Sequence, residues 1–88
     1  MAQLIHRHPP VVLGFEDAAY EPQTFGERRA DGTWEGWIEF QPLTPGAVPV
    51  LTDRETTQPN LEALAYWASG LEPVYFEGAF ERALPIAN

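Results

Sequence analysis

The sequence predicts an α+β fold in which an antiparallel sheet of three to four strands carries one or two C-terminal helices packed on one face. Two observations lead to this class. Apolar and polar residues alternate on both sides of an Asp-Gly pair near the middle of the chain, and apolar residues recur at helical spacing after residue 60. Strand signals followed by helix signals, rather than the two in alternation, are typical of α+β proteins.

A chain of 88 residues is long enough for one hydrophobic core and too short for two. We place this core in a single domain over residues 11–88, preceded by a flexible N-terminal arm over residues 1–10. The arm contains His6 and His8, which we interpret as solvated side chains, because a metal site needs three or four fixed ligands. The apolar run 11–15 follows the arm and predicts a short strand.

The clearest local signal is a β-hairpin closed by Asp31-Gly32, a pair that favours a two-residue type I′ turn. Counting outward from such a turn places Gly26 opposite Trp37. Because side chains alternate between the faces of a strand, this register also defines one apolar face. We assign the following residues of that face to the core: Phe25, Trp34, Ile38 and Phe40.

The second half of the chain predicts one further strand and then the helices. The strand is expected over residues 48–52, where Pro49 indicates either an edge position or a late start. The first helix has Thr57 as its expected N-cap and Gly70 as its end, in the left-handed conformation. The second helix is expected over residues 75–84. Residues 73–76 fit either the start of this helix or a last strand.

The charge balance indicates what kind of partner the chain binds. It has 13 acidic residues against five basic ones, and its net charge is -8. Proteins that bind nucleic acids or anionic membranes use basic residues to contact phosphates, so we expect neither role. We expect instead a protein partner with a basic surface, or a homodimer, which would add buried area to a small core.

Several motifs are missing from the sequence. There is no cysteine, which excludes disulfides and thiolate metal sites. No run reaches the ~20 apolar residues of a membrane span, and no signal-peptide core is present, so we expect a cytoplasmic protein. Neither a phosphate-binding loop nor a serine elbow occurs. The sequence therefore predicts no catalytic residue, no cofactor and no metal, and favours a non-enzymatic protein-binding module.

The interface of such a module is expected to contain two tryptophans. Trp37 lies on the hairpin face opposite the predicted core, between Glu35 and Glu39, and Trp67 lies at the border of the apolar stripe of the first helix. Tryptophan at a surface border is favoured in protein interfaces. The alternative for Trp37 is burial under a second layer of structure.

The polar run 54–60 predicts a second kind of site. A helix N-terminus has free N–H groups and a partial positive charge, so a small molecule or an anion could bind there. Catalysis at this place would need an acid or base such as Glu55 or Glu72. The alternative is a helix cap with a structured loop. The residues expected to hold the ligand are Arg54, Thr56, Thr57 and Asn60.

Two parts of the sequence resemble known families. Residues 32–40 (GTWEGWIEF), 55–60 (ETTQPN) and 66–73 (YWASGLEP) are similar to a family of short bacterial proteins without an assigned function, and this resemblance implies no activity. Residues 37–46 (WIEFQPLTPG) and 61–67 (LEALAYW) resemble HicB-type antitoxin domains, in which a strand, a proline-glycine turn and an alanine-rich helix follow one another. The second resemblance implies an antitoxin-type role, with a small basic toxin as partner.

Overall fold

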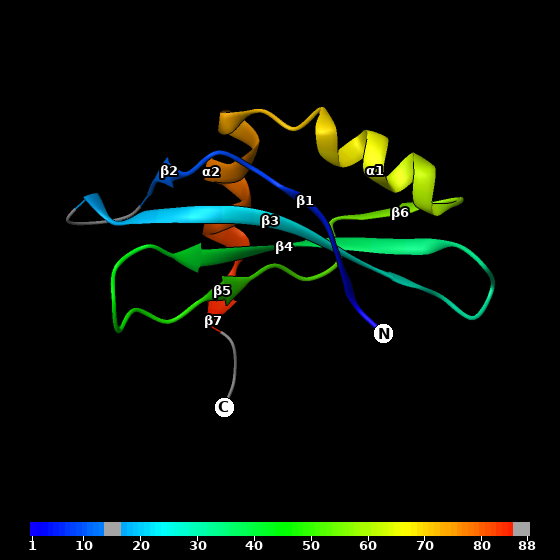
Figure 1. Cartoon of the computed structure of the whole chain (residues 1–88), viewed down its shortest axis with the longest axis horizontal. Coiled ribbons are helices and arrows are strands. Elements are labelled where there is room, and N and C mark those ends of the chain that lie inside the picture. Colours follow the sequence, from blue (N-terminus) through cyan, green and yellow to red (C-terminus); the bar gives the residue numbers. More distant parts are fainter. Residues whose placement is uncertain (14–16, 86–88) are drawn as a thin grey trace.

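A computed structural model of the chain describes residues 1–13 and 17–85 and contains an antiparallel sheet with two helices (Figure 1). The elements in chain order are β1 (Gln3–Arg7), β2 (Val11–Val12), β3 (Ala19–Arg28), β4 (Trp34–Pro42), β5 (Val50–Leu51), β6 (Thr56–Gln58), α1 (Leu61–Ser69), α2 (Pro73–Arg82) and β7 (Leu84–Pro85). The strand order is β1-β3-β4-β5-β7, and in addition β2 pairs with β3 and β6 with β4. The α+β class is confirmed. Within the described residues, however, the sheet has 7 strands rather than three or four.

The central hairpin β3–β4 closes through a longer turn than the sequence predicts. The Arg29 N–H donates to the Thr33 carbonyl at 2.7 Å, and the Gly32 N–H donates to the Arg29 carbonyl at 3.0 Å. Of the turn residues, Gly32 alone has a positive φ, at 89°. A type I′ turn would need a positive φ at Asp31 as well, so the turn is a three-residue loop that ends in a left-handed glycine.

The extra turn residue moves the register of the hairpin by one. Gly26 pairs with Gly36 rather than with Trp37, and Phe25 pairs with Trp37 rather than with Ile38. Since side chains alternate along a strand, Phe25 leaves the predicted core face and joins Trp37 on the opposite face. The alternation along β4 itself is as predicted, and one face of this strand carries Trp34, Ile38 and Phe40.

The core lies between this face and α2. Ile38 and Phe40 are fully buried, and Phe76 and Ala79 of α2 pack against them. The Phe40 ring meets the rings of Phe76 and Phe80 edge on, with centroid distances of 6.4 and 5.2 Å. Full burial of one such ring stabilises the fold by about 2–3 kcal/mol. The α2 helix is therefore held mainly by aromatic packing.

The helix α1 is positioned by one leucine that fits over two glycines. Gly26 and Gly36 are cross-strand partners on the core face. A Cβ atom at Gly26 would lie 2.5 Å from Leu64 Cδ2, and one at Gly36 would lie 2.7 Å from Leu64 Cδ1. Leu64 is fully buried. The two missing side chains thus leave a notch in the sheet, and both helices pack on the same face.

The helix ends differ from the predicted ones. The N-cap of α1 is Asn60 rather than Thr57, and its Oδ1 accepts from the Ala63 N–H at 2.8 Å. Gly70 ends this helix as predicted, but with a φ of -95° instead of the left-handed conformation. The α2 helix begins at Pro73, so residues 73–76 are helical and not a strand. Proline suits the first turn because its missing N–H would have no partner there.

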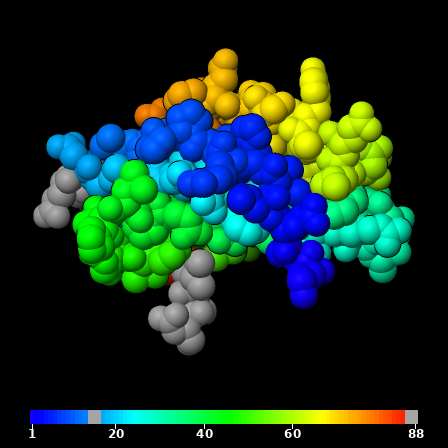
Figure 2. Space-filling view, viewed as in Figure 1, coloured from blue at the N-terminus to red at the C-terminus, as the bar shows by residue number. Residues whose placement is uncertain are grey.

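The N-terminal segment contributes a strand to the sheet, so the prediction of a flexible arm over residues 1–10 is wrong for Gln3–Arg7. The strand β1 pairs with β3, and in Figure 2 its blue atoms run across the front of the molecule. Arg7 secures its end, because its Nε and Nη2 donate to the Glu21 carboxylate at 2.9 Å. His8 follows and is only 5% exposed, with Nε2 2.8 Å from Thr24 Oγ1. The interpretation of His8 as a solvated side chain is therefore wrong too.

The two short strands are confirmed in part. Of the predicted strand 11–15, Val11–Val12 form β2, whereas Gly14 and Phe15 lie outside the described residues. Of the predicted strand 48–52, Val50–Leu51 form β5, which starts after Pro49. The edge alternative for this strand is wrong, since β5 pairs with β4 on one side and with β7 on the other. Neither α1 nor α2 has the length and apolarity that a membrane-spanning helix needs.

Candidate functional site

The sheet face opposite the helices has an aromatic pair at its centre. Phe25 of β3 and Trp37 of β4 are cross-strand partners, and their rings are nearly parallel, with an interplanar angle of 17° and centroids 6.5 Å apart. Both side chains are partly buried. Because α1 and α2 pack on the other face, neither helix covers this pair. We call this surface the open face.

Carboxylates surround the aromatic pair. By strand alternation the open face of β3 and β4 also carries Glu21, Glu27, Glu35 and Glu39. Three of these have a cationic partner. Arg7 lies 2.9 Å from Glu21, Arg29 lies 3.6 Å from Glu35, and the N-terminal ammonium lies 3.1 Å from Glu27. The surface is thus acidic, but most of its charge is compensated within the chain.

Glu39 differs from the other three glutamates. Within residues 1–13 and 17–85 it has neutral hydrogen-bond donors and no cation as partner. The Trp37 Nε1–H donates to Oε2 at 3.5 Å, and the Gln41 Nε2–H donates to Oε1 at 3.1 Å. A carboxylate without a counter-charge beside an indole ring is an arrangement that attracts a cationic group.

Three of the four residues predicted for a protein interface lie together. Glu35, Trp37 and Glu39 alternate along β4 and share the open face. Trp67 does not lie with them, because it packs against the hydrophobic core on the helix side of the sheet. The exposed aromatic residue of α1 is its neighbour Tyr66, which is 83% exposed. The helical spacing predicts that either Tyr66 or Trp67 lies outside the core, but it does not decide which of them.

The residues predicted for an anion site do not form one loop at a helix N-terminus. Thr56 and Thr57 belong to β6, which pairs with β4, so their side chains point to opposite faces of the sheet. The Thr56 hydroxyl accepts from the Gln58 side chain at 2.7 Å. Asn60 is engaged as the cap of α1, and Arg54 precedes the strand as an exposed residue. Of the alternative prediction, a helix cap with a structured loop, the cap is present at Asn60, whereas Thr56–Gln58 form a strand instead of a loop.

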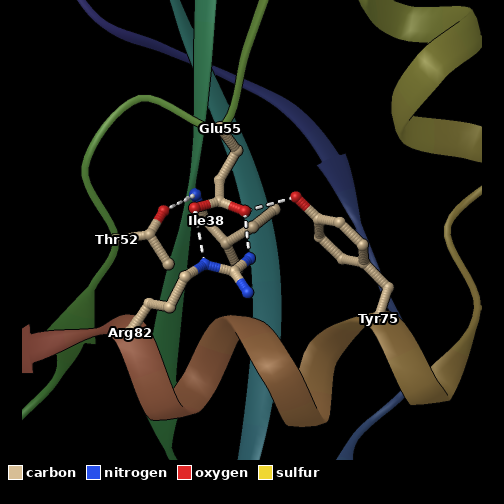
Figure 3. Close-up of polar contacts among 5 residues, drawn as sticks. All are labelled: Ile38, Thr52, Glu55, Tyr75 and Arg82. Atoms are coloured by element: carbon tan, nitrogen blue, oxygen red, sulfur yellow. Dashed lines mark hydrogen bonds and ion pairs between the residues drawn. The ribbon is translucent and has the colours of Figure 1, made fainter.

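A polar cluster that sequence reasoning missed joins the segment before β6 to α2 (Figure 3). The Tyr75 hydroxyl donates to Glu55 Oε1 at 2.5 Å. Arg82 donates to the same carboxylate, from Nη2 to Oε1 and from Nε to Oε2, the latter at 3.4 Å. The Glu55 side chain is only 10% exposed. Tyr75 and Arg82 are two helical turns apart, so their common face could be predicted from spacing, whereas the contact with Glu55 is long-range.

The neighbouring backbone explains how Glu55 is placed. The chain crosses from β5 to β6 over residues 52–55 and is bonded to β4 at both ends of this crossing. Thr52 Oγ1 accepts from the Ile38 N–H at 3.0 Å, and the Thr52 N–H donates to the Ile38 carbonyl at 2.9 Å (Figure 3). The Glu55 N–H donates to the Gly36 carbonyl at 2.7 Å. These bonds fix the position from which the Glu55 carboxylate reaches α2.

The electrostatics of this cluster favour a structural role. Burial, and then the hydrogen bond to Glu55, raise the pKa of the Tyr75 hydroxyl above its usual value, so the phenol stays neutral. The hydrogen bond to Glu55 raises the pKa of Arg82, so the guanidinium stays charged. The carboxylate therefore has one ionic and one neutral partner. All three groups are engaged with one another, and the cluster clamps α2 to the sheet.

Two histidines, His6 and His8, lie close together near the N-terminus, with ring centroids 4.7 Å apart. Burial, and then the charge of His6, lower the pKa of His8 to about 4, and its ring packs 4.7 Å from that of Phe76. The His8 side chain is thus neutral near pH 7 and part of the core. In the part of the chain that the structure describes, no three histidine, aspartate or glutamate side chains converge as metal ligands would.

Comparison with known proteins adds no family to these observations. No protein-family model matches the chain, and no similar protein was found among the curated proteins or the solved structures.

Proposed function

We propose that this chain is a small acidic, non-enzymatic module that binds a protein partner with a basic surface through the open face of its sheet. The observation that carries the proposal is the Phe25–Trp37 pair, which lies at the centre of a face that neither helix covers. Aromatic residues at the centre of a patch with a polar, charged rim are the usual anatomy of a protein interface.

Binding is favoured over catalysis by the state of the polar groups. The most buried carboxylate outside the sheet face, Glu55, is already engaged by Tyr75 and Arg82. An active site needs an acid, a base or a nucleophile that is free to reach a substrate, and the Glu55 carboxylate is not free in this way.

A basic partner is favoured over self-association by charge. The net charge is -8, and a two-fold contact through the open face would set its glutamates against their own copies. Like charges that face each other across an interface cost free energy, whereas a basic partner gains from the net negative charge and from Glu39, whose partners within the described residues are neutral. The antitoxin-type hypothesis is a special case of this proposal, in which the basic partner is a small toxin.

The test compares two aromatic variants that lie on opposite sides of the sheet. Trp37→Ser removes the centre of the open face, and Tyr66→Ser removes the exposed aromatic residue of α1 as a matched control. The tagged chain and both variants are used to capture proteins from the cells that produce it, and bound proteins are identified by mass spectrometry. We expect a partner that is lost with Trp37→Ser, retained with Tyr66→Ser and weakened by added salt.

Two outcomes would count against the proposal. If both variants capture the same proteins as the unaltered chain, the open face is not the binding surface. Sedimentation velocity of the purified chain provides the second measurement. A dimer that Trp37→Ser dissociates would replace the basic partner by a second copy of the chain.

A further inference from the structure

We propose that Trp37 and Glu39 together form a seat for an arginine side chain of the partner. The inference rests on the proposed function and names the group that the open face recognises. It starts from the one carboxylate of this face whose partners, within the described residues, are all neutral. The seat is the indole ring of Trp37 with the Glu39 carboxylate at its Nε1 edge.

The carboxylate provides the charge of the seat. Glu39 is partly buried, which weakens the screening of its charge by water. The Trp37 and Gln41 side chains each donate one hydrogen bond to it. An ionised carboxylate has about four acceptor positions, so at least one is left on each oxygen. These two neutral donors orient the carboxylate without neutralising it.

The indole provides the flat surface. Tryptophan attracts cations more strongly than tyrosine or phenylalanine does. The nearly parallel Phe25 ring packs beside the Trp37 indole from the neighbouring strand. Both residues lie in the longest pairing of the sheet, between β3 and β4, so the surface is rigid before a partner arrives. Little ordering of the chain is then needed on binding.

Arginine fits this combination better than lysine. A guanidinium is planar and weakly hydrated, so it stacks on an aromatic ring while its N–H groups donate to a carboxylate at the edge of that ring. A lysine ammonium is a compact, strongly hydrated charge, and it gains less from the flat surface. We therefore expect the seat to discriminate between two partners of equal charge.

The experiment measures this discrimination with two peptides. One alternates arginine with glycine, and the other has lysine at every arginine position, so length and charge are equal. Each is titrated into the full ¹⁵N-labelled chain, and binding is followed by the indole N–H signal of Trp37 and by the amide signals of β4. We expect the arginine peptide to bind about three- to tenfold more tightly than the lysine peptide and to shift the Trp37 indole signal most.

Two charge variants separate the seat from the general acidity of the face. Glu39→Gln and Glu35→Gln each remove one negative charge from β4, at equal sequence distance from Trp37. Glu35 already has Arg29 as its partner, at 3.6 Å. We expect Glu39→Gln to abolish the preference for arginine, and Glu35→Gln to weaken both peptides alike while the preference remains. The dispersion of the amide signals reports whether each variant is folded.

The outcomes distinguish this inference from the proposed function. Equal affinities for the two peptides, or an equal loss of preference in the two variants, would overturn the arginine seat while leaving the open face as a binding surface. The absence of any shift at the Trp37 indole, even with peptide in large excess, would also overturn it. The proposed function fails separately, if Trp37→Ser retains every partner in the capture experiment.

Discussion

The two faces of the β3–β4 hairpin differ most in side-chain size at two neighbouring cross-strand pairs, one on each face. On the covered face Gly26 is paired with Gly36, and Leu64 of α1 fills the space above them. One residue further along, on the open face, Phe25 is paired with Trp37, and no helix lies over them within the described residues. The smallest cross-strand pair of the hairpin thus lies beside its largest.

This difference shows which constraint acts on each face. The covered face is shaped by packing, because any side chain at the two glycines would overlap with the helix above. On the open face large side chains meet no such limit, and they come with carboxylates that a purely structural surface does not require. Stability should therefore depend mainly on the covered face, and binding mainly on the open face.

The largest effect is expected from emptying the notch on the covered face. Leu64→Ala removes a fully buried side chain and leaves a cavity over the two glycines, which should lower the free energy of unfolding by about 3 kcal/mol. Urea denaturation measures this value. Gly36→Ala should be destabilising alone, because its Cβ would meet Leu64 Cδ1 at 2.7 Å, but much less so in the Leu64→Ala background. Additive effects of the two substitutions would contradict the notch.

The second effect is a loss of stability in mild acid, which also comes from the covered side. The pKa of His8 is lowered from 6.5 to about 4 in the folded chain, so between these values the unfolded chain binds more protons than the folded one. The free energy of unfolding should therefore fall as the pH decreases from 6.5 to 4, by about 2 kcal/mol at pH 5. Urea denaturation at pH 7 and pH 5 checks this.

The control for this prediction is His8→Gln. This variant is less stable at neutral pH, but the part of the pH dependence that is due to His8 should be missing from it. The Glu21 carboxylate acts at lower pH, because Arg7 and Gln23 lower its pKa and its contribution to stability is lost only as the pH falls below the ordinary pKa of a glutamate. An unchanged pH dependence in His8→Gln would show that the histidine is not the group that titrates.

Sequence patterns predicted correctly which residues of β4 share a face, but they placed Phe25 of β3 on the wrong face. The alternation along β4 is local, so the sequence was sufficient to group Ile38 with Phe40 on the core face, and Glu35, Trp37 and Glu39 on the other. The partner of each residue depends on the turn. An Asp-Gly pair fits both a two-residue and a three-residue loop, and a difference of one residue moved Phe25 to the other face.

Long-range contacts limited the rest of the prediction. The segment Thr56–Gln58 is polar throughout, so it has no apolar alternation, and only its pairing with β4 makes it a strand. For the same reason the cluster around Glu55 could not be found, because Tyr75 and Arg82 reach it from 20 and 27 residues away. Local periodicity indicates a face, whereas the partner of that face depends on the whole fold.

A third, smaller effect is expected from the clamp between α2 and the sheet. Tyr75→Phe keeps the ring that packs edge on against Trp67 and removes the hydroxyl that donates to Glu55. The carboxylate then keeps only Arg82, and the free energy of unfolding should fall by about 1.5 kcal/mol, as for a hydrogen bond to a charged group. Thermal and urea denaturation measure the change. A stability equal to that of the unaltered chain would mean that water replaces the phenol without cost.

The smallest effect on stability is expected on the open face, where the effect on binding should be largest. Trp37→Ser removes a partly buried ring and its cross-strand contact with Phe25, which should cost about 1 kcal/mol, well below the cost of Leu64→Ala. Urea denaturation of the two variants side by side gives the comparison directly. If Trp37→Ser destabilised the fold as much as Leu64→Ala, the indole would act as a core residue, and loss of a partner in this variant would only report unfolding. A small loss of stability together with a complete loss of the partner would instead separate the two faces by function, because only the covered face would then be needed for the chain to fold.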